Sequence, residues 1–130
     1  MDYLADTIAL VRYLRGGRGL GRQARKILRE ADQGRHTIAI SGVTLMEVLD
    51  LSEHRRIPVN LDMLDDLLAQ SRNYTVVPVG LEVVRAAAAI DDIPELHDRL
   101  IVGTATWLVI PILTNDPVMI ASRHVETVWE

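Results

Sequence analysis

Cysteine is absent from this chain of 130 residues. A disulfide framework and a thiolate metal site are therefore excluded, and any bound metal must be held by oxygen atoms or by the four histidines. Phenylalanine is absent too, and aromatic residues make up only 4% of the chain, which leaves few side chains for nucleic-acid bases to stack on. We expect any nucleic-acid partner to be held through its phosphates and its shape.

Long apolar runs are also missing. No segment approaches the roughly 20 apolar residues that a membrane helix requires, and the opening MDYLAD has no basic segment leading into an apolar one. We therefore expect a soluble, untargeted protein, and the lack of cysteine is compatible with a cytoplasmic location. Apolar residues still form 48% of the chain, so residues 1–130 are predicted to build one core and a single domain.

The formal net charge of −4 is unevenly distributed. Residues 12–35 contain eight basic and two acidic residues, a net charge of +6, so the rest of the chain carries −10. Apolar residues recur at helical spacing within this segment, which places its arginines on the opposite helix face. This face is either an ordinary solvated surface or a surface that binds RNA phosphates. The residues proposed for RNA binding are Arg18, Arg22, Arg25 and Arg29.

Strand and helix patterns alternate along the chain. Strands are predicted at 2–6, 36–41, 74–79, 110–114 and 125–129. Such alternation predicts an α/β fold with right-handed crossovers and a mostly parallel sheet of about four or five strands, covered by helices on both faces. We expect the first strand to be central and the last to lie at an edge.

The helix patterns predict which side chains face the core. In the helix at 7–14, Ile8, Val11 and Leu14 are expected to be buried. A further helix is expected to begin at Thr44. In the helix that follows Asn60, the leucines are expected to point inward, namely Leu61, Leu64, Leu67 and Leu68. The alanine run at 86–89 suggests a helix packed closely against a neighbour.

Four acidic residues each lie at the end of a predicted strand or in the first turns of the following helix. They are Asp6, Glu47, Asp98 and Asp116, which we refer to as the four carboxylates. Because ligands of open α/β sheets bind beyond the carboxyl ends of the strands, these side chains are expected to converge. Oxygen ligands suit Mg²⁺ or Mn²⁺, and a cation would relieve their mutual repulsion. A cation held there can activate water and stabilise charge on a phosphodiester.

Each of the four carboxylates also has a structural explanation. Thr44 and Glu47 fit a capping box, and Asp116 followed by Pro117 fits a helix N-cap. Asp6 and Asp98 stand where negative charge suits a helix N-terminus. The presence of all four at one predicted edge, from separate βα units, favours the metal site.

Four segments resemble the PIN domain family, and specifically its small VapC-type toxins. They are ADT at Ala5–Thr7, SGVTLMEVL at Ser41–Leu49, HDRLIVGTA at His97–Ala105 and ILTND at Ile112–Asp116. Their order and spacing match across essentially the whole chain. The resemblance implies a three-layer α/β/α sandwich and an endoribonuclease that uses Mg²⁺ or Mn²⁺ to hydrolyse RNA phosphodiesters. It also implies a protein antitoxin as partner and a homodimer.

The resemblance assigns roles to individual residues. Asp6 and Asp98 are expected to bind the metal directly, whereas Glu47 and Asp116 bind it through water or orient the nucleophile. Thr114 and Asn115 either hydrogen-bond the site or simply form the turn that ends a strand.

The chain also departs from the family pattern. Ile8 replaces an asparagine that family members often have, and Glu95 stands where many have aspartate. Glu95 is either an accessory ligand or an exposed loop acid. His97 either contacts a phosphate or is incidental, and Asp50 is interpreted as a surface charge.

Two other functions are compatible with parts of the pattern. A catalytically silent PIN-like module that binds RNA or protein is left open by Ile8, although all four carboxylates are present. A phosphoacceptor receiver domain also gathers aspartates at strand ends, but it needs a lysine near its last strands, and the only lysine here is Lys26.

Overall fold

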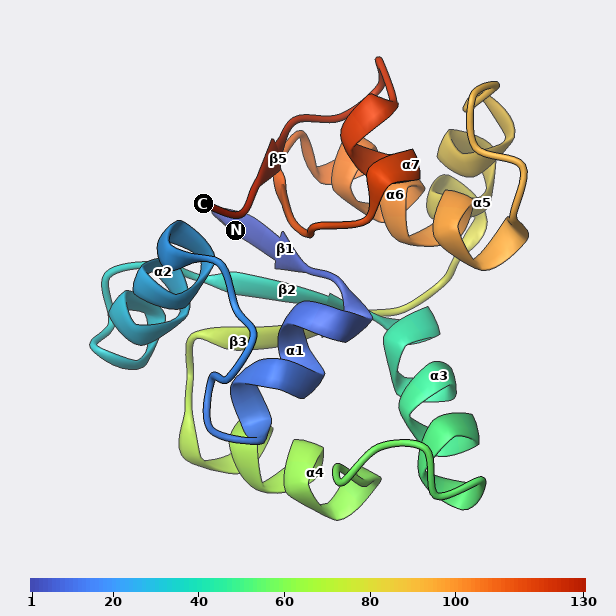
Figure 1. Ribbon diagram of the computed structural model, residues 1–130. Helices are drawn as coiled ribbons and strands as arrows, with labels where there is room; N and C mark the ends of the chain where they lie inside the picture. The colour runs from blue at the N-terminus through green and yellow to red at the C-terminus, as the bar shows by residue number, and fades with distance from the viewer.

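The computed structural model describes residues 1–130, which fold around one five-stranded sheet (Figure 1). Every neighbouring pair of strands is parallel, and the order is β3-β2-β1-β4-β5. The first strand is central and the last is at an edge, as predicted. The strands are β1 (Tyr3–Ala5), β2 (Ile38–Ser41), β3 (Tyr74–Val77), β4 (Ile112–Leu113) and β5 (Thr127–Val128).

Seven helices flank the sheet, and the predicted three-layer α/β/α arrangement is confirmed. None of these helices is long and apolar enough to cross a membrane. The helices are α1 (Thr7–Leu14), α2 (Arg22–Asp32), α3 (Gly42–Glu53), α4 (Leu61–Gln70), α5 (Leu81–Ala88), α6 (Leu96–Leu108) and α7 (Pro117–Ala121).

Successive strand residues enter two different cores, because side chains of a strand alternate between the faces of a sheet. Leu4 joins the apolar cluster that includes residues of α6 and α7, whereas its neighbour Ala5 joins the cluster beneath α1, α2 and α4. Ile112 and Leu113 of β4 divide in the same way. Burial on both faces explains why the strands appear in the sequence as continuous apolar runs.

Three expectations about the helices are wrong. Ile8 is 41% exposed, because α1 packs on the sheet through Ala9 and Leu10. Leu61 is 38% exposed, because it lies at the first position of α4, ahead of the turn that Leu64 buries. The third helix begins at Gly42, since the hydroxyl of Ser41 accepts the Val43 N–H at 3.1 Å and caps the helix two residues before Thr44.

Helices α5 and α6 approach each other closely, as the alanine run suggested. A Cβ atom on Gly103 of α6 would lie 2.8 Å from the backbone nitrogen of Ala87 and 3.1 Å from its Cα. Glycine inside a helix costs about 1 kcal/mol relative to alanine, and the close contact explains its presence here. This contact fixes α6, whose first turn contains Asp98.

We predict that Gly103→Ala lowers the free energy of unfolding by about 1–3 kcal/mol, because the clash with the Ala87 backbone outweighs the gain in helix propensity. Gly80→Ala is the matched control, since its Cβ would meet only Glu82 Oε2, at 3.5 Å. The control should change stability by less than about 1 kcal/mol. Urea denaturation of both variants measures the difference, and equal losses would contradict the packing argument.

Candidate metal centre

Asp6 follows β1 directly and is only 3% exposed. Its Oδ1 accepts the Ala9 N–H at 2.8 Å, so it is the N-cap of α1. Burial raises the pKa of Asp6 to about 6, against the opposing effects of hydrogen bonds from Thr114 and from the Ala9 backbone, and the charges of Asp116 and Glu47 raise it further. A buried carboxylate with no basic partner is therefore the innermost group of the site.

Glu47 lies on α3 and is held from α1. The Thr7 hydroxyl donates to Glu47 Oε1 at 2.5 Å, and the Thr7 and Thr44 hydroxyl oxygens are 3.0 Å apart. The proposed capping box is therefore wrong: Thr44 is inside the helix, and Ser41 is its N-cap. From the sequence, Thr7 was assigned no role and Thr44 was assigned only to the capping box, although both lie within the segments that resemble the PIN family.

Asp98 lies in the first turn of α6 without capping it. Glu95 is the N-cap, and its Oε2 accepts the Asp98 N–H at 2.8 Å. Burial is the main cause that raises the pKa of Asp98 to about 6, followed by the charges of Asp116, Glu95, Glu47 and Asp6. Glu95 is therefore more than an exposed loop acid, because it caps α6 and its charge raises the pKa of Asp98.

Asp116 joins β4 to α7. Its Oδ1 accepts the Val118 N–H at 2.8 Å, and Pro117 occupies the start of α7, so the predicted N-cap is confirmed. The Asp116 N–H donates to Thr114 Oγ1 at 3.0 Å, and Thr114 is fully buried. Asn115 is exposed and forms no side-chain hydrogen bond. Of these two neighbours, only Thr114 forms a side-chain hydrogen bond, and it does so with the backbone of Asp116.

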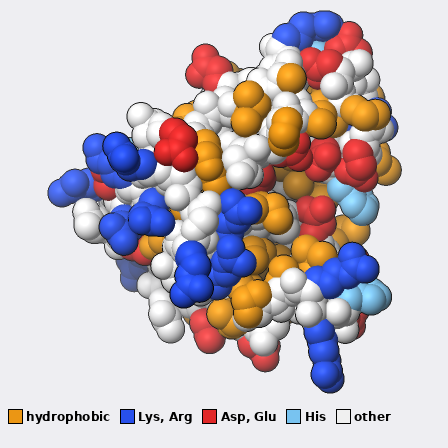
Figure 2. All heavy atoms as spheres, in the orientation of Figure 1, with side chains coloured by type: hydrophobic (Ala, Val, Ile, Leu, Met, Phe, Trp, Pro, Cys, Tyr) orange, Lys and Arg blue, Asp and Glu red, His pale blue; other side chains and the backbone are white.

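The effects on pKa show that the four carboxylates lie within electrostatic range of one another. The charges of Glu47 and Asp116 raise the pKa of both Asp6 and Asp98. No lysine or arginine is among the groups that shift either pKa. Figure 2 shows acidic side chains gathered at the right of the molecule, where Figure 1 places the start of α6 and the neighbouring end of α3. Uncompensated oxygen donors of this kind fit a hard divalent cation.

No three of the four carboxylates place ligand atoms within 4.8 Å of one another, and the group of side chains that does so lies elsewhere. Asp91, Asp92 and His124 place ligand atoms within 4.8 Å of one another. The carboxylate of Asp91 is already paired, because it contacts Arg123 Nη2 at 2.6 Å and His124 Nε2 at 2.8 Å. These contacts lower the pKa of Asp91, the reverse of the situation at Asp6 and Asp98. A cation therefore has more charge to neutralise at the four carboxylates.

A cavity of about 320 Å³ adjoins Glu47 and is lined by Met46, Glu47, Asp50, Leu51 and His97. Asp50 and His97, interpreted from sequence as a surface charge and an incidental neighbour, both border it. The position of Asp50 three residues after Glu47, on the same helix face, was the sequence signal for this proximity.

A group of basic side chains lies away from these acids, over α2 at the left of Figures 1 and 2. A groove of about 610 Å³ there is lined mainly by polar and charged side chains, including Arg22, Arg25, Lys26, Arg29 and Glu30. Arg25 donates to the Gly17 carbonyl at 2.9 Å, and Lys26 pairs with Glu30 at 3.8 Å. Arg18 lies on the loop before α2 and outside this groove.

The model of the PIN domain family matches residues 3–122, so the chain belongs to the PIN domain family. The fold is similar to a chain of the VapBC2 complex from Rickettsia felis bound to promoter DNA, with a TM-score of 0.75, 18% identity and 100% of both chains covered. It is also similar to VapC20 of Mycobacterium tuberculosis, a sarcin–ricin loop cleaving toxin (TM-score 0.67, 14% identity, 99% of this chain and 100% of that chain).

A third similar structure is FitAcB from Neisseria gonorrhoeae, with a TM-score of 0.66, 19% identity, and coverage of 96% of this chain and 95% of that chain. At such low identity these likenesses show a shared fold. Comparison with curated proteins gives no significant match.

The raised pKa values predict an unusual pH dependence in metal-free protein. Folded Asp6 keeps its proton up to about pH 6, whereas the unfolded chain releases it near the ordinary value of 3.8, so charging this group lowers stability as pH rises between these values. Asp6→Asn should therefore raise the free energy of unfolding by about 1–3 kcal/mol at pH 7.5, and the gain should vanish towards about pH 4.

Urea denaturation in EDTA across this pH range measures the effect. Asp66→Asn, at an exposed position on α4, is the control and should show no such pH-dependent gain. If the difference in unfolding free energy between Asp6→Asn and wild type did not change with pH, ionisation of Asp6 would not be what destabilises the folded protein.

Proposed function

We propose that residues 1–130 act as a single-domain, metal-dependent endoribonuclease of the VapC type, which hydrolyses RNA phosphodiesters with Mg²⁺ or Mn²⁺. The observation that carries this proposal is the set of four uncompensated carboxylates, contributed by separate βα units of a PIN fold. Asp6 and Asp98 would hold the cation directly, and Glu47 and Asp116 would act through water. When bound, the cation would supply Lewis-acid stabilisation of the phosphate and a more acidic water.

The chain's own residues hold these groups in place. The hydrogen bond from the Ala9 N–H to Oδ1 fixes the orientation of the Asp6 carboxylate. The Thr7 hydroxyl occupies one oxygen of Glu47, so its other oxygen is available to orient a water or accept its proton. Glu95 satisfies the helix terminus in place of Asp98, whose carboxylate is thereby left for ligation.

The partners follow from the same proposal. VapC20 supports RNA as the substrate class, and the VapBC2 and FitAcB assemblies support a cognate protein antitoxin. A homodimer in the cytoplasm completes the proposal.

We predict that purified protein cleaves a pool of structured RNAs with Mg²⁺ or Mn²⁺ and not in EDTA. Asp6→Asn and Asp98→Asn should each reduce the cleavage rate by about 100-fold or more, because each removes a charged ligand while keeping the side-chain shape. Gel analysis of cleavage products at equal protein stability measures this loss.

The control is Asp66→Asn, which should cleave as wild type does. Cleavage that survived both active-site substitutions would refute the assignment of the site. Metal binding and RNA binding without cleavage would favour the catalytically silent PIN-like module. That alternative is supported by Ile8, which is exposed and replaces the asparagine that family members often have.

We further propose that the basic face of α2 and the preceding loop binds RNA phosphates away from the scissile bond. Arg22 and Arg29 line the groove, are exposed, and form no ion pair, whereas Arg25 and Lys26 are partly engaged within the protein. Arg18 lies on the loop between α1 and α2, next in sequence to this surface.

The double variant Arg22→Ala/Arg29→Ala should weaken RNA binding and reduce the slope of log affinity against log salt concentration by about 1–2, since two phosphate contacts are lost. Fluorescence anisotropy at several salt concentrations measures both quantities. The matched control is Arg55→Ala/Arg56→Ala, which removes two exposed arginines from the turn after α3. Equal slopes in the two double variants would mean that the α2 face is only a solvated surface.

A further inference from the structure

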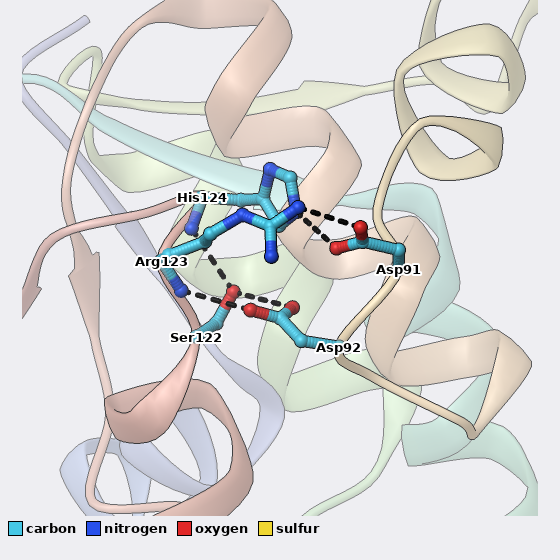
Figure 3. A network of polar contacts seen from close by, with 5 residues as sticks. All are labelled: Asp91, Asp92, Ser122, Arg123 and His124. Carbon is cyan, nitrogen blue, oxygen red and sulfur yellow. Dashed lines mark hydrogen bonds and ion pairs between the residues drawn. The ribbon is translucent and has the colours of Figure 1, made fainter.

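A polar network joins two loops on the side of the sheet that α6 and α7 cover (Figure 3). Asp92 accepts the Ser122 hydroxyl and the Arg123 N–H, both at 2.9 Å. Asp91 contacts Arg123 Nη2 and His124 Nε2. We refer to these five residues as the clasp: Asp91, Asp92, Ser122, Arg123 and His124.

The clasp connects the two segments that position Asp98 and Asp116. Asp92 lies on the loop that leads into α6, six residues before Asp98, and Ser122 is the C-cap of α7, six residues after Asp116. The clasp and this pair of carboxylates therefore lie at opposite ends of the same two segments.

The two ends of these segments experience opposite forces. At one end of these segments Asp98 and Asp116 carry like charges, which repel each other. Helix α7 has only five residues, and Met119 is its one buried side chain. A helix this short has little packing to resist being pushed outward.

The clasp supplies attraction where the packing is thin. Ile90 and Ile93 of the loop share an apolar cluster with Met119, and the clasp closes the polar edge of that cluster. Hydrogen bonds and neighbouring positive charge lower the pKa of both Asp91 and Asp92 below the usual range, so the clasp carboxylates remain ionised at neutral pH. Asp91 forms a salt bridge with Arg123, whereas no lysine or arginine is among the groups that shift the pKa of Asp6 or Asp98.

We propose that the clasp is a positioning device, which holds α7 against the loop before α6 and so sets the separation of Asp98 and Asp116 for a shared cation. Asp92 is its central positioning residue, because it alone binds both the side chain of Ser122 and the backbone of Arg123. The part that concerns the cation rests on the proposed function, whereas the tie between the two segments does not.

The test compares Asp92→Ala with Asp92→Asn. Alanine removes both contacts, whereas asparagine has the same shape and can accept from the Arg123 N–H while contacting Ser122 Oγ. Asp66→Ala is the control, because it removes one negative charge from an exposed position that forms no side-chain hydrogen bond.

Two quantities are measured on each protein. Amide hydrogen exchange of Val118 and Ile120 in metal-free protein reports the opening of α7, and titration calorimetry reports Mn²⁺ affinity. In Asp92→Ala we expect the exchange rate to rise about fivefold and the Mn²⁺ affinity to fall about fivefold. In Asp92→Asn both quantities should stay within about twofold of the wild-type values.

Unchanged exchange in Asp92→Ala would overturn the proposal. Faster exchange with unchanged Mn²⁺ affinity would overturn the positioning role, because α7 would then be tied without consequence for the site. An equal loss of affinity in Asp66→Ala would show a general charge effect and would also overturn it. If wild-type protein bound no Mn²⁺, the proposed metal-dependent function would fail, and the exchange rates alone would decide whether the clasp ties α7.

Discussion

Repulsion among four carboxylates is the interaction on which the arrangement of this protein depends. The parallel sheet brings the residues that follow its strands to one edge, and the packing buries Asp6 among three other acids. Such a group of like charges tends to open the structure unless it binds protons or a cation. The surrounding contacts resist that opening: the Thr7 hydroxyl holds Glu47, Gly103 lets α6 pack closely on α5, and the clasp fastens α7.

Helix capping and metal ligation are compatible at this site. Asp6 and Asp116 each use Oδ1 to accept a backbone N–H, and a carboxylate has a second oxygen with its own lone pairs. The cap fixes the orientation of the side chain and so prepares the other oxygen for ligation. The two explanations that the sequence left open for these residues therefore describe two atoms of the same group.

The sequence predicted the elements whose signal is local. The boundaries of α1, the central position of β1 and the N-cap at Asp116 follow from apolar periodicity and from residue preferences at helix ends. Ile8 and Leu61 were misplaced because, in a short helix, a face is set by what it packs against rather than by spacing alone. The Thr7–Glu47 bond and the clasp join residues about 30–40 positions apart, and such pairs leave no periodic pattern in one sequence.

The distribution of charge also distinguishes the two acidic groups of this small domain as binding sites for a cation. Asp91 pairs with the Arg123 guanidinium and Asp92 accepts the Arg123 backbone N–H, so a metal would have to displace existing partners. At Asp6 and Asp98 it would neutralise charge that raises both pKa values to about 6. Under the proposed function, unbalanced charge is therefore a better guide to the metal site than close grouping of ligand atoms.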